Sequence, residues 1–359
     1  MSLNQEKSKI LDRFLKAQAD LVLQSADLSV GSIAEMVKDG AIDVAPAFQR
    51  RERWQNDKQS ALIESFLLNV PVPPIYLAEE EYGSYSVVDG KQRIIAMNKF
   101  INEGMKLTKL ERFKELEGFA FDDLPREMSN ALRIRPYLRV ITLLKQSSNT
   151  LKYEVFTRLN RAGVPMLPQE IRNVAFRGAL NDLMTELGKN KFLKKQLKIQ
   201  SHLSLAYTKM TDTEFVLRFF TVRDRWETFS GIMQTEMDHF MLRNLEASPA
   251  KLKSFETSFN VAIEACEEVW GNDAFKRPEG STTRNQVLQG VYDVQMVGVS
   301  LFEDRISDVI RQKNRIKNAF QKEFSSNSEF AEAMKQFTSN PGRLGYRINR
   351  MRELILSVL

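Results

Sequence analysis

One stretch organises the first half of the chain: Tyr85-Ser86-Val87-Val88-Asp89-Gly90-Lys91-Gln92-Arg93-Ile94-Ile95-Ala96-Met97. A short β-branched run ends at Asp89-Gly90, and apolar residues at helical spacing follow directly. The pattern predicts a strand, a sharp turn at Gly90 and a helix that begins at once. A helix start favours anions, because unpaired N–H groups and the positive end of the helix dipole lie there.

Two basic side chains follow the turn. Arg93 offers a planar guanidinium that suits phosphate oxygens, and Lys91 adds a second positive charge. A structural interpretation is also open, since Asp89 as N-cap and Gln92 three residues later resemble a capping box, which is worth about 1 kcal/mol. That interpretation leaves Arg93 unexplained, because a cation in the first turn opposes the dipole. From local chemistry alone the two interpretations are equally supported.

Length and composition indicate a folded protein with more than one domain. The chain has 359 residues, of which 43% are hydrophobic, enough for two domains with substantial cores. No apolar run is long enough for a membrane span, and the first residues carry no signal-peptide core. Cys266 is the one cysteine, so no disulfide forms within the chain. We therefore expect a cytoplasmic protein, no contact with a membrane, and a buried Cys266 thiol.

The charge balance permits contact with nucleic acid without requiring it. The chain has 52 basic and 46 acidic residues, a formal net charge of +6. Its two histidines, His202 and His239, stand far apart, and no Cys-x-x-Cys pair exists, which excludes most zinc sites. The same scarcity of histidine argues against a complete HNH-type nuclease site on this chain.

The sequence predicts an α+β protein, with a mixed α/β half to about Ala179 and an all-helical domain beyond it. In the first half we expect helices at 11–28, 29–38 (with Ser32 as a possible cap), 57–68 and 90–101, and strands at 75–78, 85–88 and 134–143. Later helices are expected at 150–159, 168–176, 212–229, 250–270, 285–302, 306–320 and 328–337, with a loop at 271–281. The expected domains are an N-terminal helix (1–25), a mixed domain (26–179) and a helical domain (180–359).

The C-terminal segment carries four arginines, largely at helix-like spacing: Arg343, Arg347, Arg350 and Arg352. Such spacing is typical of a solvated helix face, where charged side chains project into water. A strip that binds phosphates is the alternative interpretation. The sequence favours the first and leaves the second open.

Three sequence blocks occur in a fixed order. The first consists of Phe48-Gln49-Arg50, Trp54 and Val70-Pro71-Val72-Pro73-Pro74. The second is Val88-Asp89-Gly90-Lys91-Gln92-Arg93. The third is Phe156-Thr157-Arg158-Leu159-Asn160-Arg161-Ala162-Gly163, followed by Leu167, Glu170 and Arg172-Asn173. From about Ala26 to Gly178 the chain therefore resembles the ParB/sulfiredoxin-like nucleotidase family found in the S part of GmrSD-type modification-dependent restriction systems.

The resemblance implies a ParB/sulfiredoxin-like fold with a nucleotide site. In that family an Asp-Gly-Gln-Gln-Arg element forms the phosphate site, and the domain binds or hydrolyses nucleoside triphosphates in bacterial defence against phage or modified DNA. Carried onto this chain, with Lys91 added for its charge, the nucleotide-binding residues are Gln49, Arg50, Asp89, Gly90, Lys91, Gln92, Arg93, Asn160, Arg161 and Gly163. Asp89 and Arg93 are the candidate catalytic residues.

Two positions depart from the family pattern. Lys91 stands where glutamine is usual, and its added positive charge is compatible with phosphate binding. Ile95 stands where a small hydroxyl residue is common, so a contact to metal or water is lost there. The sequence therefore supports nucleotide binding more strongly than hydrolysis. Many such proteins carry an HNH nuclease domain after the nucleotidase, and we expect this chain to lack it.

The outer blocks also have structural interpretations. Arg50 belongs to a basic loop that water alone can solvate, and Gly163 fits the left-handed position of a helix C-cap. Glu170 fits a helix cap as well as it fits a general base. Two helices flank the segment around Gly163, but the connection is too long and apolar for a DNA-reading helix-turn-helix.

Three functions stay open. The main hypothesis is a nucleotide-binding protein, and in its stronger form a nucleoside triphosphatase with Mg²⁺ as candidate cofactor, that acts with DNA in bacterial restriction or phage defence. A separate nuclease effector is a candidate partner, and the helical half a candidate homodimer interface. The alternative is a non-enzymatic scaffold that binds DNA or a protein partner. A DNA nickase is the weakest reading, because no cluster of metal ligands is apparent.

Overall fold

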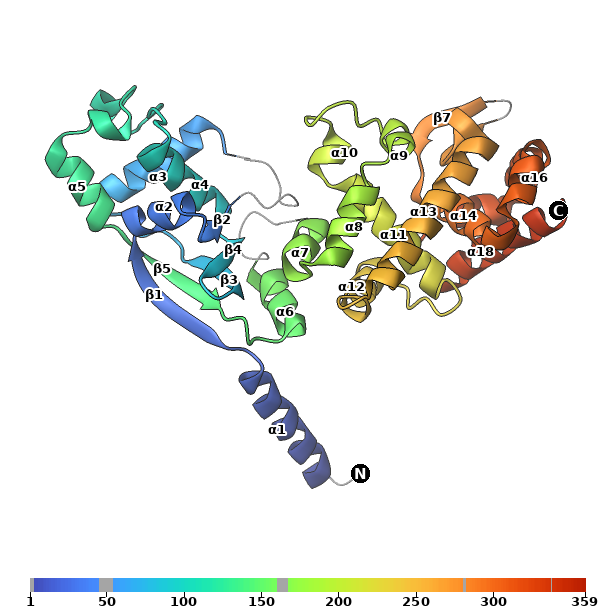
Figure 1. Ribbon diagram of the computed structural model, residues 1–359, viewed down its shortest axis with the longest axis horizontal. Helices are drawn as coiled ribbons and strands as arrows, with labels where there is room; N and C mark the ends of the chain where they lie inside the picture. Colours follow the sequence, from blue (N-terminus) through green and yellow to red (C-terminus); the bar gives the residue numbers. More distant parts are fainter. Residues whose placement is uncertain (1–2, 45–53, 160–166, 280–281, 337) are drawn as a thin grey trace. The chain divides into compact units, whose positions relative to one another are not determined.

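The computed structural model describes residues 3–44, 54–159, 167–279, 282–336 and 338–359 (Figure 1). The chain divides into two compact units, Met1–Ala175 and Phe176–Leu359. The first contains a five-stranded sheet and its helices, and the second is mostly helical. This confirms the predicted fold class. No helix within the described ranges is long and apolar enough to cross a membrane.

A mixed sheet forms the framework of the first unit. Its strands are β1 (Leu23–Ser29), β2 (Ile42–Asp43), β3 (Ile75–Glu81), β4 (Ser84–Asp89) and β5 (Tyr137–Leu143), in the order β1-β5-β3-β4-β2. β3 and β4 form an antiparallel hairpin that turns at Gly83, whose φ is +78°. β5 runs parallel to β3 and antiparallel to β1, while β2 is parallel to β4. The carboxyl end of β4 leads directly to the Asp89-Gly90 turn.

Helices cover this sheet and enclose the hydrophobic core. The helices of the first unit are α1 (Leu3–Ala19), α2 (Val30–Lys38), α3 (Asn56–Leu67), α4 (Lys91–Asn102), α5 (Arg126–Ile134), α6 (Asn149–Leu159) and α7 (Pro168–Ala175), with short 3₁₀ turns at Lys114–Leu116 and Phe121–Asp123. The core lies where the apolar faces of α2, α3 and α4 meet the sheet, and it includes Ile33, Ile63, Ile94 and Phe100. Burial of these apolar faces holds α4, and with it the turn, in place.

Three sequence predictions in the first unit are wrong in detail. The helix predicted over 11–28 ends at Ala19, and residues 23–28 belong to β1. β1 pairs with β5, a partner more than one hundred positions later, which local periodicity cannot reveal. Ser29, not Ser32, caps α2, because the Ser29 Oγ accepts the Ser32 N–H at 3.1 Å. The residues before Pro136 form α5, so β5 begins after the proline.

The second unit is a bundle with one added hairpin. Its helices are α8 (Ala179–Leu187), α9 (Lys191–Gln196), α10 (Leu205–Thr208), α11 (Thr211–Arg225), α12 (Met233–Arg243), α13 (Pro249–Trp270), α14 (Gln289–Ser300), α15 (Ile306–Arg311), α16 (Lys313–Ser326), α17 (Ser328–Lys335) and α18 (Pro341–Leu356), with 3₁₀ turns at Gly271–Asp273 and Glu303–Arg305. β6 (Lys276–Glu279) and β7 (Thr282–Val287) pair antiparallel. The hairpin replaces part of the predicted loop at 271–281 and the predicted helix start at 285, while the rest of the unit is helical as predicted. Cys266 is buried, as predicted, and burial raises the pKa of its thiol.

A buried cluster of charged side chains joins α11, α14 and α18 in the second unit. Asp293 on α14 receives two hydrogen bonds of 2.6 Å from Arg218 on α11 and one of 2.6 Å from Arg347 on α18. All three side chains are buried, and Arg347 also donates to the Ala333 carbonyl. Arg347 is therefore an interior residue, and neither a solvated face nor a phosphate strip describes it.

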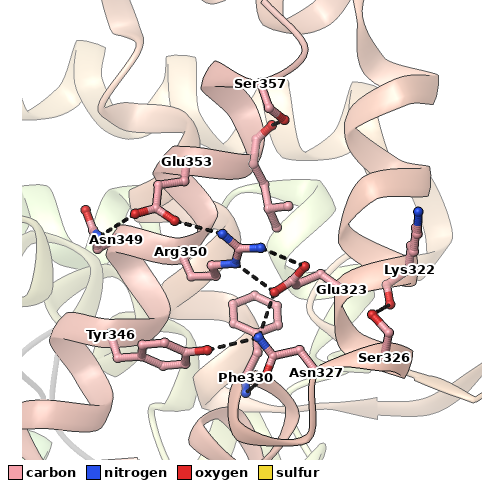
Figure 2. A network of polar contacts seen from close by, with 11 residues as sticks. Lys322, Glu323, Ser326, Asn327, Phe330, Tyr346, Asn349, Arg350, Glu353 and Ser357 are labelled. Carbon is pink, nitrogen blue, oxygen red and sulfur yellow. Dashed lines mark hydrogen bonds and ion pairs between the residues drawn. The ribbon is translucent and has the colours of Figure 1, made fainter.

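A second polar network joins α16, α17 and α18 (Figure 2). Arg350 donates to both carboxylate oxygens of Glu323, at 2.7 and 3.1 Å, and to Glu353 at 2.8 Å. Asn327 donates to Glu323 and Tyr346, and its Oδ1 caps α17. The hydrogen bond from Arg350 lowers the pKa of Glu323. Arg350 is thus engaged by two carboxylates, which supports a structural role for this C-terminal helix.

Candidate functional site

The predicted strand, turn and helix are present at Asp89-Gly90. β4 ends at Asp89, Gly90 adopts φ +95° and ψ 7°, and α4 begins at Lys91. The first helical hydrogen bond runs from the Ile94 N–H to the Gly90 carbonyl, at 3.0 Å. Gly90 occupies the N-cap position, and glycine has no side chain with which to cap the helix. The capping box of Asp89 and Gln92 is therefore not formed, because Asp89 still belongs to the strand.

Arg93 folds back against the turn that precedes it. Its Nη2 donates to Asp89 Oδ2 at 2.9 Å and to the Pro74 carbonyl at 3.0 Å. The Arg93 side chain is only 15% exposed, whereas that of Asp89 is 43% exposed. The buried Nε of Arg93 has no hydrogen-bond partner among the residues with a described position. An unsatisfied buried donor costs free energy, so this atom calls for an explanation.

Glycine is required at position 90 for two reasons. Its φ lies in the left-handed region, which side chains with a Cβ rarely adopt. A Cβ there would also lie 3.0 Å from Arg93 Nη2 and 3.0 Å from Ile75 Cγ1. The guanidinium of Arg93 therefore packs directly against the backbone of the turn.

Gln92 connects the start of α4 to the segment before α3. Its Oε1 accepts the backbone N–H of Trp54 at 3.1 Å, and Gln59 donates to the Trp54 carbonyl at 3.1 Å. The Trp54 side chain packs against the core of the unit. Gln49 and Arg50 lie outside the described residues, and Trp54 is the first described residue after them. Their predicted role in the nucleotide site stays a prediction.

The third sequence block flanks a buried polar cluster on α7. Asn160, Arg161 and Gly163 also lie outside the described residues. The polar side chains that follow are buried: Gln169, Glu170, Arg172 and Asn173. Gln169 donates to Asn173 at 2.9 Å and accepts from Arg172 at 3.3 Å.

Glu170 acts as a cap for α7. Its Oε2 accepts the Leu167 N–H at 2.7 Å, and its side chain is buried at the start of the helix. This is the structural interpretation of Glu170, and it accounts for the carboxylate without a catalytic role. Sequence reasoning missed the neighbouring Gln169. The signal available was two polar pairs, Gln169-Glu170 and Arg172-Asn173, on either side of Ile171 in an otherwise apolar helix.

The described part of the candidate site thus brings together one carboxylate and two cations. Asp89, Lys91 and Arg93 surround the amino end of α4, where the helix dipole is positive. No group of three or more His, Cys, Asp or Glu side chains that could hold a metal ion occurs among the residues with described positions. The arrangement is suited to an anion with several oxygen atoms, held by the backbone and by guanidinium or ammonium groups.

The fold and this turn define a mixed α/β domain with a strand-turn-helix junction at Asp89-Gly90. Residues 33–177 match the family described as GmrSD restriction endonuclease, N-terminal domain. This match confirms the resemblance to a GmrSD-type N-terminal domain found in the sequence. No curated protein and no solved structure gives a match. The helical unit lies almost entirely outside the matched segment.

Proposed function

We propose that this chain binds a nucleoside triphosphate and acts with DNA in bacterial restriction or phage defence. The matched family is described as a restriction endonuclease domain, which supports the role in restriction. One observation carries the nucleotide part of the proposal. At the amino end of the twelve-residue helix α4, a left-handed glycine ends a strand and an arginine packs against that glycine.

The phosphates would lie at the amino end of α4. The dipole of α4 favours negative charge there, and Gly90 lets a ligand approach the backbone closely. A guanidinium has five N–H donors, and the described hydrogen bonds of Arg93 engage Nη2. Its remaining donors include the buried Nε that lacks a partner within the described residues. Lys91 contributes a second positive charge at the first position of the helix.

Hydrolysis is the more demanding form of the proposal. Asp89 is the carboxylate at the turn, and it would contact Mg²⁺ carried by the triphosphate. Ile95, on the first turns of the same helix, offers no oxygen to metal or water. We therefore place nucleotide binding first and assign Asp89 and Arg93 as the residues on which hydrolysis would depend.

A scaffold without enzymatic activity is the second candidate function. The observation that favours it is the internal pairing of Arg93, whose Nη2 already contacts Asp89 and Pro74. In that case the turn would be stable without any nucleotide, and DNA or protein contacts would carry the function.

Calorimetric titration distinguishes the nucleotide-binding function from the scaffold function. ATP, GTP and CTP with Mg²⁺ would be titrated into the wild-type protein, into Arg93→Ala and into Arg139→Ala. Arg139 is a matched control, because it also pairs with an aspartate, Asp27, but lies on β5. We expect binding in the wild type and in Arg139→Ala, and a loss of roughly tenfold to a hundredfold in Arg93→Ala, since one charged hydrogen bond is worth about 1.5–3 kcal/mol. Circular dichroism would verify that each variant is folded.

Two results would contradict the proposal. One is a wild-type protein that binds none of the three nucleotides, which would leave the scaffold as the better description. The other is an equal loss of affinity in both arginine variants, which would show that the turn is not the binding site.

A further inference from the structure

A strongly basic segment lies in the second unit, beyond the matched domain. Residues 187–211 contain six lysines and neither aspartate nor glutamate. They include α9 and the chain that leads to α11. A run of charge alone is usually a solvated surface. The structure adds that lysines of this segment meet a lysine from a different part of the chain.

The meeting point lies beside the β6–β7 hairpin. Lys198 Nζ donates to the Asn285 carbonyl on β7 at 2.7 Å. Lys276, on β6, has a lowered pKa because of its burial, and the nearby charges of Lys198 and Lys195 lower it further, against the opposing effect of Asp273. The strand that Lys198 contacts, β7, pairs with β6, which carries Lys276, so ammonium groups from two segments of the chain gather at this hairpin. We call Lys195, Lys198 and Lys276 the lysine surface.

A nearby carboxylate, Asp273, offsets part of the positive charge of this surface, and its effect on Lys276 exceeds that of Lys198 or of Lys195. Asp273 is the carboxylate that acts on Lys276, and its Oδ2 is already paired with Lys317 at 2.8 Å. Lys194, adjacent to the surface, lies over the ring of Tyr207, 6.0 Å from the ring centre. An external anion would therefore relieve repulsion that the described part of this unit leaves in place.

Lys198 also has a strained backbone. Its φ is +58°, and it follows α9, where the Ile199 N–H bonds to the Lys194 carbonyl at 2.9 Å. Glycine is the residue favoured at such a left-handed helix end. The helix dipole explains lysines in the last turn of α9, but a glycine at position 198 would fit the backbone better. Strain of this kind concentrates at functional positions, which points to a use for the Lys198 ammonium group.

We infer that the lysine surface binds the phosphate backbone of duplex DNA. Lysine recognises phosphates as a point charge and reads no base sequence, so the contact would hold DNA without selecting it. Neighbouring phosphates along a duplex lie close enough for several lysines to be engaged together. The choice of DNA among polyanions rests on the proposed function. The surface itself belongs to the helical unit, and its chemistry does not depend on the turn at Gly90.

Salt-dependent DNA binding tests the inference. Fluorescence anisotropy of a short labelled duplex would give the affinity of the full-length protein at several salt concentrations. The test variant is Lys195→Gln, Lys198→Gln, Lys276→Gln, and we expect it to bind the duplex more weakly than the wild type. The slope of log K against log salt should also be smaller in magnitude by about 3, because each lost phosphate contact removes about 0.9 from that slope. The matched control is Lys253→Gln, Lys322→Gln, Lys335→Gln. It replaces three exposed lysines of the same unit and therefore lowers the net charge of the protein by the same amount as the test variant. Its slope should equal that of the wild type.

A glycine variant separates function from folding. Lys198→Gly should keep or raise the unfolding temperature, because it removes the left-handed strain, and should weaken DNA binding at low salt. Unchanged DNA affinity in Lys198→Gly would overturn the inference. Equal losses in the two triple variants, or no binding of duplex by the wild type, would overturn it as well. Tighter binding to anionic lipid vesicles than to duplex, with the same lysine dependence, would assign the surface to lipid instead.

The nucleotide proposal and the DNA inference can be tested independently of each other. Nucleotide titration of the lysine triple variant should match the wild type, and Arg93→Ala should bind the duplex as the wild type does. If Arg93→Ala lost DNA binding while the lysine triple variant kept it, DNA would contact the first unit and the inference would be wrong.

Discussion

Arg93 Nη2 lies 2.9 Å from Oδ2 of Asp89, four residues earlier, so the ion pair spans the turn at Gly90. The pair fixes the guanidinium against the backbone, and 43% of the Asp89 side chain stays exposed. The same carboxylate can therefore orient Arg93 and face an incoming ligand. These two roles are separable by experiment.

Asp89→Asn tests whether the carboxylate serves a metal ion. We expect the variant to bind ATP with Mg²⁺ about tenfold more weakly, because an amide oxygen is a poorer ligand for Mg²⁺ than a carboxylate. Binding of ATP in EDTA should fall less, since Arg93 and the helix end remain. Calorimetry under both conditions measures the difference. Equal losses would mean that Asp89 acts through the position of Arg93 alone.

Gly90→Ala is expected to destabilise the first unit more than Gly83→Ala does. Both glycines have positive φ, so each alanine costs about 1–2 kcal/mol of backbone strain. A Cβ at Gly90 would also press on Arg93 and Ile75, whereas nothing lies within 4 Å of a Cβ at Gly83. Thermal unfolding of the two variants isolates the packing effect. Similar losses would show that Arg93 moves aside without cost.

Glu64→Gln should lower stability in a pH-dependent way. The buried Glu64 carboxylate accepts the N–H groups of Glu111, Arg112 and Phe113 at 3.1, 2.7 and 2.9 Å. Burial by itself would raise its pKa, but these three hydrogen bonds outweigh it and the pKa is lowered. A lowered pKa stabilises the fold above the unfolded-state value of about 4.3 and ceases to do so as pH falls through the folded-state value.

We therefore expect Glu64→Gln to cost about 1.5–3 kcal/mol at neutral pH and less in acid. Urea unfolding at both pH values measures this difference. Glu115→Gln is the control, since Glu115 is exposed nearby and should cost little at either pH. A loss for Glu64→Gln that does not change with pH would contradict the ionised state assigned to it.

Asp293→Asn should destabilise the second unit severely. Asp293 balances two buried arginines, Arg218 and Arg347, and its loss would leave both without a counter-charge. Removing one partner of such a buried pair costs about 3–5 kcal/mol. Arg347→Met should cost less, because Arg218 and Asp293 remain a balanced pair. Denaturant unfolding followed by circular dichroism ranks the two, and the reverse order would be incompatible with this charge balance.

Local signals in the sequence were sufficient to predict the secondary structure at the centre of the candidate site. The β-branched run, Gly90 and the apolar spacing after it lie within one short stretch, so the strand, turn and helix were predicted correctly. The sequence could not show that the capping box is not formed or that Arg93 pairs with Asp89. Both depend on the φ of Gly90 and on Arg93 folding back to Asp89, which only the folded backbone determines.

Features that join distant segments were missed for a common reason. β1 needs β5 to become a strand, and Arg347 is buried because α14 supplies Asp293. Likewise, the lysines of residues 187–211 are visible in the sequence, but their meeting with Lys276 requires the hairpin. Helical periodicity carries no information about such partners.

The pairing of β1 with β5 also sets an order of events during synthesis. Asp27 and Arg139, which face each other across these strands, are 112 positions apart. At elongation rates of about 5–20 residues per second, β5 is synthesised on the order of ten seconds after β1. A chain that stalls or is truncated before Leu143 would keep an unpaired strand edge, which is open to aggregation. The first unit can therefore be expressed alone only as a piece that extends beyond β5.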